Sequence, residues 1–323
     1  MKNIRIIPRL DIKGPNLVKG IHLEGLRVLG KPEHFARYYY EAGADELFYM
    51  DVVASLYGRN SLLDIITRTA NEIFIPLTVG GGLRTIDDIK TVLRAGADKV
   101  ALNTAAINNP ALIKEAAQRF GSSTIVISIE TIRQKDGRYL CYTDCGREFT
   151  GRNVFEWVKE AERMGAGEII LTSVDREGTG MGFDLELTRR VSESVSIPVI
   201  ACGGAGQVEH IRDVIMEGKA DAVSIASILH YDFIRANPVE LKGFEEGNVE
   251  FLKKGGHFSK IHPVGILQIK EFLLEHGVDV RHALGLGEFG KVKSQKSKDK
   301  SQKSEAIVKK FSPIDIEHMT YDV

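Results

Sequence analysis

The sequence has few of the features that mark secreted, membrane-bound or metal-binding proteins. Its three cysteines, Cys141, Cys145 and Cys202, cannot all pair, and the Cys141–Cys145 spacing lacks the second pair of a zinc site. We therefore expect reduced thiols in a cytoplasmic protein, with no metal. No apolar run reaches transmembrane length. Residues 1–3 lead directly into a strand-like run, so we also expect no signal peptide.

An excess of one charge sign is also lacking, because 43 basic residues are matched by 44 acidic ones, for a net charge of −1 at pH 7. No overall electric field therefore favours nucleic acid or a membrane as a partner. What the sequence does have is length and apolar content. Its 323 residues, 43% of them hydrophobic, are enough for one large α/β domain or two small ones.

The first apolar run ends in a carboxylate. Residues 6–10 read as a buried strand that leads into Asp11, and Gly14-Pro15 then turns the chain. A carboxylate at a strand end is costly to bury without a partner or a chemical role. In parallel α/β proteins, ligands bind at that edge of the sheet. Asp11 is therefore a candidate site residue, and the alternative is an aspartate that only caps its loop.

Strand-like runs recur along the chain, and helical patterns follow them. Most runs are continuously apolar, which is typical of a parallel sheet buried on both faces. The expected helices include 32–42, 86–95, 110–120 and 153–164. The eight expected strands are 4–10, 46–51, 75–79, 99–103, 124–130, 168–173, 198–202 and 222–225. Eight such units in about 230 residues predict a (β/α)8 TIM barrel. An open doubly wound sheet would need a glycine-rich turn after its first strand, and residues 13–16 do not form one.

The two halves of the chain resemble each other. Residues 76–82 align with 198–204, and residues 43–47 align with 165–169, at an offset of about 120 residues. Asp11 aligns with Glu130 at nearly the same offset. A near-constant offset over separate segments predicts an α/β barrel built from two similar half-barrels.

The duplication predicts two phosphate sites with two acids between them. Each half has an acid at the end of its first strand, glycines after its third and small polar residues after its fourth. Glycine lets backbone N–H groups approach an anion closely. The alternative is that these glycines serve only tight turns. The expected acids are Asp11 and Glu130, and the expected phosphate ligands are Gly81, Gly82, Asn103 and Thr104 in the first half and Gly203, Gly204, Ala226 and Ser227 in the second.

Taken together, these motifs resemble the cyclase subunit of imidazole glycerol phosphate synthase over about residues 1–230. The resemblance implies a lyase of histidine biosynthesis that forms a heterodimer with a glutaminase and uses no cofactor. Ammonia from the glutaminase crosses the barrel and reacts with the bis-phosphate phosphoribulosyl-formimino-aminoimidazole carboxamide ribotide. The products are imidazole glycerol phosphate and aminoimidazole carboxamide ribotide. The matching residues are 5–8, 10–11, 18–20, 78–82, 103–105, 165–168, 171–173 and 175–176.

The same resemblance implies roles for individual residues. Asp11 and the acid at position 130 share the acid–base work. Lys19 holds the glycerol-phosphate end or helps to close its loop. Further substrate contacts fall on Thr172, Glu177 and Gly178. At the opposite end of the barrel the family has a charged ammonia gate, matched by Arg5, Glu46, Lys99 and Glu168, and a glutaminase contact, matched by Asp98. The gate residues can pair with one another, and the alternative is that they are solvated strand ends.

Four positions depart from the family pattern. Glu130 replaces an aspartate, which shifts the carboxyl by about 1 Å, and such a displacement can cost about a hundredfold in rate. Arg9 replaces a small cysteine and points into the barrel with Asp11. A buried guanidinium needs a partner, so we predict that Arg9 pairs with Asp11 or Glu130. Residues 14–16 lose a basic residue, and Glu177 replaces an aspartate near the second phosphate.

These changes lie at the reaction centre, whereas the gate is unchanged, so a second hypothesis stays open. The chain could be a paralogous barrel that channels ammonia from a glutaminase to an amidotransferase in surface-polysaccharide amidino-sugar synthesis. A barrel that only scaffolds its partner is a third, and the presence of both acids argues against it. In either case we expect a barrel over 1–286 with an insertion at about 231–262, and a disordered Lys/Ser-rich extension over 287–323.

Overall fold

The computed structural model describes residues 3–54, 62–237 and 260–281. All of them belong to one unit, Met1–His282. The C-terminal extension expected over 287–323 lies outside the described residues, as does most of the insertion expected at 231–262. The first residues of that insertion continue helix α10 (Ser227–Ala236). None of the described helices is both long and apolar enough to span a membrane.

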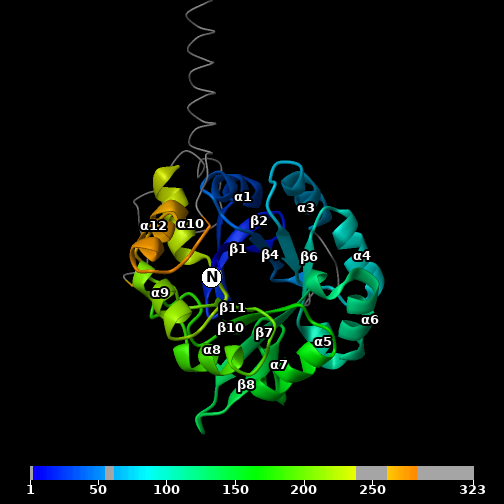
Figure 1. Cartoon of the computed structure of the whole chain (residues 1–323). Helices are drawn as coiled ribbons and strands as arrows, with labels where there is room; N and C mark the ends of the chain where they lie inside the picture. Colours follow the sequence, from blue (N-terminus) through cyan, green and yellow to red (C-terminus); the bar gives the residue numbers. More distant parts are fainter. Residues whose placement is uncertain (1–2, 55–61, 238–259, 282–323) are drawn as a thin grey trace, which may run out of the picture. The chain divides into compact units, whose positions relative to one another are not determined.

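Parallel strands form a closed ring with helices outside it (Figure 1). Around the ring the order is β1, β4, β5, β6, β7, β10, β11 and β12, and β12 pairs again with β1. The strand bounds are β1 Arg5–Lys13, β4 Leu47–Asp51, β5 Leu77–Gly80, β6 Lys99–Leu102, β7 Ile125–Arg133, β10 Glu168–Ser173, β11 Val199–Cys202 and β12 Ala222–Ile225. The expected (β/α)8 TIM barrel is thereby confirmed, and each predicted strand is found within a few residues of its expected bounds.

Helices connect the strands on the outside of the ring. Several begin where the sequence supplies a cap: Thr85 and Asp88 form a reciprocal capping box at α4 (Ile86–Arg94), and Asp184 caps α8 (Leu185–Ser192). The remaining helices in the described residues besides α10 are α1 Pro32–Glu41, α3 Leu63–Ala70, α4 Ile86–Arg94, α5 Thr104–Asn108, α6 Ala111–Phe120, α7 Val154–Arg163, α8 Leu185–Ser192, α9 Val208–Met216 and α12 Ile266–Glu275, with a 3-10 turn η1 at Ser122–Thr124.

Two antiparallel hairpins were not predicted. The first strand of each half, β1 or β7, is nine residues long and continues beyond the barrel into a hairpin. The first hairpin is β2 (Asn16–Ile21) with β3 (Glu24–Gly30), and the second is β8 (Tyr139–Thr143) with β9 (Glu148–Asn153). Asp11 pairs with β2, and Glu130 pairs with β8, so the two acids hold equivalent places in the two halves. The hairpins therefore extend the duplication seen in the sequence.

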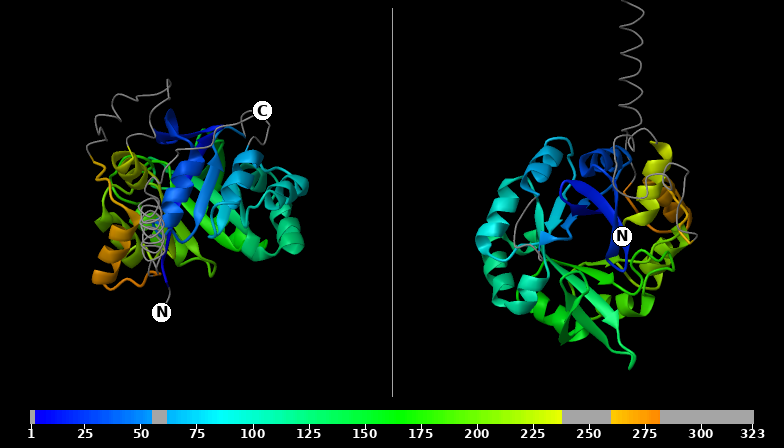
Figure 2. Two further views of the ribbon diagram at one scale, coloured as in Figure 1. Left: turned by 90° about the horizontal axis from the view of Figure 1, so that it is seen from above. Right: turned by 180° about the vertical axis from the view of Figure 1, so that it is seen from behind.

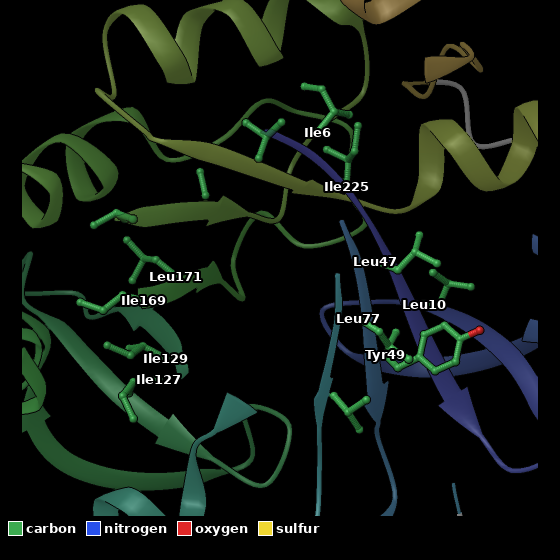
Figure 3. Packing of buried hydrophobic residues seen from close by; sticks show 14 of the residues in the cluster. Ile6, Leu10, Leu47, Tyr49, Leu77, Ile127, Ile129, Ile169, Leu171 and Ile225 are labelled. Carbon is green, nitrogen blue, oxygen red and sulfur yellow. The ribbon is translucent and has the colours of Figure 1, made fainter. Parts of the chain in front are cut away.

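The strands bury two separate apolar layers. Outward-facing residues such as Ile6, Leu47 and Ile127 pack with the helices. Figure 3 shows side chains from neighbouring strands lying side by side, such as Ile6 with Ile225 and Leu10 with Leu47. Inward-facing residues such as Phe48 and Ile170 form a second cluster inside the ring. The alternation of side chains along each strand separates the layers, and the barrel interior is therefore a distinct compartment.

The two rims of the barrel are distinguished by what lies on them. The start of β1 lies at one end, and the β2–β3 hairpin lies at the other (Figure 2, left). At the first end Asp45, Asp98 and Asp221 accept hydrogen bonds from the backbone N–H groups of Ile6, Leu77 and Val199 at 2.7–2.8 Å. These aspartates attach loops to strand starts. The hairpin end is the carboxyl rim, where a TIM barrel carries its active site.

Candidate active site

Asp11 and Glu130 face each other across the carboxyl rim. In the ring, β1 and β7 are separated by three strands in either direction, so their acids lie on opposite sides of the same mouth. Both are buried, with 3% and 5% of their surface exposed. Burial of two carboxylates needs compensation, and the structure compensates them in different ways.

Asp11 is compensated by Arg9, from the same strand. The Nε atom of Arg9 donates to Oδ1 of Asp11 at 2.8 Å, which confirms the predicted pairing and assigns it to Asp11. The Nη1 atom of Arg9 donates to Thr172 at 3.3 Å and to the Cys202 sulfur at 3.4 Å. Burial alone would lower the pKa of Arg9, but attraction to Asp11, Cys202 and Glu177 outweighs it, and the pKa is raised. The guanidinium therefore stays charged inside the barrel.

Glu130 is compensated by the backbone of the β8–β9 turn. Its Oε2 atom accepts from the N–H of Gly146 at 2.8 Å. Asp144, Cys145 and Gly146 all have positive φ, so this turn curls back over the strand end. Burial raises the pKa of Glu130 to about 7, although the charge of Arg9 and the Gly146 hydrogen bond lower it. Glu130 can therefore hold or release a proton near neutral pH.

The first-half glycine turn lies in one cavity with Glu130. Gly81 and Gly82 follow β5 with φ of +99° and +70°, and a Cβ atom at Gly81 would lie 2.3 Å from the carbonyl oxygen of Asp51. Only glycine fits such a backbone. The cavity has a volume of about 390 Å³, and Asn103 and Thr104 line it. The predicted first phosphate ligands and one acid thus share a single space.

The second-half glycine turn lies in a much smaller cavity of about 20 Å³. Gly203 and Gly204 follow β11 with φ of +92° and +115°, and Ala226 and Ser227 lie at the start of α10. The same cavity is lined by Arg9, Lys19, Glu177 and Gly178. The two halves therefore supply equivalent backbone turns, but charged side chains fill the space beside the second one.

An ion pair fastens the first hairpin over this smaller cavity. Lys19 of β2 pairs with Glu177, and both side chains are buried. Glu177 also accepts from the N–H of Leu23 at 3.1 Å, and its carbonyl accepts from the N–H of His22 at 3.0 Å. The hairpin is thereby attached to the loop after β10. Lys19, Glu177 and Gly178 therefore lie together at one place.

A ring of charges lies at the opposite end of the barrel. Arg5 contacts Glu46 at 2.9 Å and Glu168 at 3.0 Å, and Lys99 contacts the same two acids at 3.0 Å each. Thr78 donates a further hydrogen bond to Glu46 at 2.5 Å. Each cation bridges both acids, so the predicted pairing is confirmed. Glu46 is buried and the other three side chains are partly exposed, and all four satisfy one another rather than standing as isolated strand ends.

Sequence reasoning missed several residues of the site. Gly146, which binds Glu130, belongs to the unpredicted second hairpin; the Asp-Cys-Gly run at 144–146 is the turn signal that could have found it. Arg84 and Asp144 also line the large cavity. Asp98, expected at a partner contact, uses one carboxylate oxygen to cap Leu77. Within the described residues, no cluster of His, Cys, Asp and Glu could hold a metal ion.

Comparison with known proteins extends over most of this barrel. Residues 5–235 match the family described as "Histidine biosynthesis protein". The imidazole glycerol phosphate synthase subunit HisF of Legionella pneumophila is 61% identical over 212 residues, which is 66% of this chain and 100% of the relative. The subunit of the same name from Alkaliphilus metalliredigens is 47% identical over 228 residues, which is 71% of this chain and 90% of the relative.

Proposed function

The chain belongs to the histidine biosynthesis protein family, within its imidazole glycerol phosphate synthase cyclase subunits, and from this premise we propose how its barrel performs the reaction. The reaction is of the lyase type. Ammonia and phosphoribulosyl-formimino-aminoimidazole carboxamide ribotide give imidazole glycerol phosphate and aminoimidazole carboxamide ribotide. The observation that carries the proposal is the placement of two buried acids on opposite sides of one rim, between two equivalent glycine turns.

The glycine turns bind the two phosphates of the substrate. The first phosphate enters the large cavity beside Gly82, Asn103 and Thr104, which is open to a ligand. The second lies beside Gly203 and Gly204, where the Lys19–Glu177 pair now fills the space. Binding there requires the β2–β3 hairpin to shift, and Lys19 then exchanges Glu177 for the phosphate. A loop that closes over substrate in this way also excludes water.

The two acids move the protons of the reaction. Attack of ammonia on carbon leaves a nitrogen that must lose a proton, and cleavage of the C–N bond leaves a nitrogen that must gain one. A pair of carboxyl groups on opposite sides of the substrate supplies both transfers. Asp11 and Glu130 are the acids that reach the mouth from opposite strands.

The purified chain tests this function directly. With the bis-phosphate substrate and ammonium chloride, and without a partner, we expect release of imidazole glycerol phosphate. Glutamine should replace ammonium only when a glutaminase subunit is added. If ammonium supports no turnover while the chain still stimulates glutamine hydrolysis by the partner, the acceptor is a different molecule. The names of the relatives do not favour that alternative, which was the amidino-sugar pathway.

The lumen supplies the path for ammonia. The charge ring of Arg5, Glu46, Lys99 and Glu168 lies at one end, and the acids lie at the other. Between them the hydroxyl groups of Ser128 and Ser224 are buried without a hydrogen-bond partner among the described residues. Strand alternation points both into the lumen. Such groups can hydrogen-bond a small polar molecule on its way through.

Opening the charge ring should uncouple the two reactions. In Arg5→Ala each acid loses one of its two cations and keeps its Lys99 contact, so ammonia can leak and the product formed per glutamine hydrolysed should fall clearly below one. Turnover with saturating ammonium chloride should change less than twofold. The ratio of product formed to glutamine hydrolysed is measured in the reconstituted complex. Arg37→Ala is the control, because it breaks an exposed ion pair with Glu41 on α1. An unchanged ratio in Arg5→Ala would remove the gate from the proposal.

The glutaminase binds at the end of the barrel that carries the ring. Asp98 lies there, and so does Phe74, which precedes β5 with 79% of its surface exposed and contacts Tyr40 edge-on. An exposed aromatic residue of this kind is typical of an interface. Phe74→Asp should weaken the heterodimer at least tenfold, measured by titration of labelled partner, whereas Phe149→Asp, an equally apolar change on the second hairpin, should not. Equal affinities for both variants would contradict this assignment.

The three cysteines are free thiols. Two of them, Cys141 and Cys145, have their pKa raised to about 12 by burial, which keeps them protonated and unreactive. Free thiols together with a biosynthetic role support a cytoplasmic location.

A further inference from the structure

We infer that Arg9 is a positioning residue that divides the work between the two acids: it engages Asp11 as the proton acceptor and leaves Glu130 as the proton donor. The inference rests on the proposed function. It concerns Arg9, whose positively charged side chain is held inside the barrel. The argument depends on what Arg9 touches, what Glu130 touches and how the two are connected.

The geometry fixes Arg9 in one orientation. Its guanidinium donates to Asp11 through Nε and to Thr172 and Cys202 through Nη1, so three strands hold it. It also lies over the ring of Phe48, 5.6 Å from the ring centroid. A guanidinium held on several sides orients the carboxylate that it binds. The Oδ1 atom of Asp11 is therefore held in place by Arg9 at the mouth.

Within the part of the chain that the structure describes, no cation forms an ion pair with Glu130. Among the described residues its hydrogen-bond partner is the Gly146 N–H. The charged and titratable groups around it are mostly acidic: Asp11 lies across the mouth on β1, Asp144 and Cys145 lie on the β8–β9 turn, and Asp51 lines the same cavity from β4, with Arg84 the one cation among the described residues that line that cavity. Arg9 is the cation that acts on Glu130, through space rather than through a bond. The neutral, protonated form of Glu130 is favoured in these surroundings.

The division of roles follows from this asymmetry. The two acids hold equivalent places in the two halves, so the duplication by itself does not distinguish them. Arg9 on β1 breaks the equivalence. The nitrogen that forms a bond to carbon gives its proton to Asp11, and the nitrogen that leaves carbon takes a proton from Glu130. One proton is accepted and one is donated, so the transfers balance. The pKa of Glu130, raised to about 7 by burial, suits a donor near neutral pH.

The test is the pH dependence of ammonia-driven turnover in Arg9→Gln and Arg9→Lys. Glutamine keeps a hydrogen-bond donor but removes the charge that lowers the pKa of Glu130. We therefore expect the alkaline limb of the Arg9→Gln profile to move up by about one pH unit, with turnover reduced at least tenfold. In Arg9→Lys the alkaline limb should stay at the same pH as in the wild type. An unmoved limb in Arg9→Gln, or equal shifts in both variants, would overturn the inference.

A titration without substrate separates this inference from the proposed function. Infrared difference spectra of the protein report the protonated carboxyl group of Glu130, and Glu130→Gln identifies its band. The midpoint, which is the pH at which half of that band is lost, should rise in Arg9→Gln and should stay at the wild-type value in Arg9→Lys. If Arg9→Gln folds poorly, Arg9→Gln combined with Asp11→Asn removes both charges and still reports the midpoint. If the wild type does not turn over the substrate, the proposed function fails, and the infrared midpoints still decide the role of Arg9.

Discussion

Asp11→Asn is expected to reduce ammonia-dependent turnover by about 10²–10⁴-fold, because an amide cannot accept the proton that the attacking nitrogen must lose. The same change leaves the Arg9 guanidinium buried beside a neutral group. Removing one partner of a buried ion pair costs about 3–5 kcal/mol in the free energy of unfolding, and the remaining amide oxygen makes the lower value the better expectation. Steady-state kinetics and urea unfolding measure the two effects.

Two variants separate catalysis from stability. Asp45→Asn is the matched control, because Asp45 is also buried and paired, with Lys270 at 2.8 Å, but lies at the other end of the barrel. It should lose comparable stability and keep turnover per folded molecule. Arg9→Gln combined with Asp11→Asn should recover stability without recovering turnover. If Asp11→Asn retained more than a tenth of wild-type turnover, Asp11 would not be the proton acceptor.

Glu130→Gln should abolish turnover and at the same time stabilise the protein above pH 7. Turnover should fall by about 10²–10⁴-fold, because a donor is lost. The gain in stability follows from the pKa, which is about 7 in the folded protein and 4.5 in the reference state. The folded protein binds the extra proton between these values, so wild-type stability falls as pH rises from 4.5 through 7. At pH 8 the buried charge of Glu130 then lowers the free energy of unfolding by about 3 kcal/mol.

Glutamine avoids that cost, since it has no charge and its side-chain oxygen can still accept from Gly146. The measurement is urea unfolding of wild type and Glu130→Gln at pH 4.5, 6 and 8. The two free energies should be close at pH 4.5 and should diverge towards pH 8, with the variant the more stable. Parallel curves across this range would mean that Glu130 titrates at an ordinary pKa and is not held protonated by its site.

Much of the scaffold was predictable from the sequence, because its signals are local. Short apolar runs separated by amphipathic stretches specify a parallel sheet covered by helices, and a constant offset between halves specifies two similar half-barrels. The hairpins after β1 and β7 escaped prediction. Their outer strands, β3 and β9, are partly exposed and lack a continuous apolar run, so the apolar pattern that usually reveals a strand is weak there.

The sequence predicted which residues form the site but did not predict which of them bind one another. Residue types and strand ends placed Asp11, Glu130 and the two glycine turns at the mouth, and alternation pointed Arg9 inward. The sequence by itself left Arg9 with two possible partners and left the two acids alike. Only the tertiary structure decided that Arg9 binds Asp11, that Gly146 binds Glu130, and that Lys19 and Glu177 fill the second cavity. The reason is physical: a pattern along one strand fixes the direction of a side chain, whereas its partner and its degree of burial depend on strands and turns that are far away in the sequence.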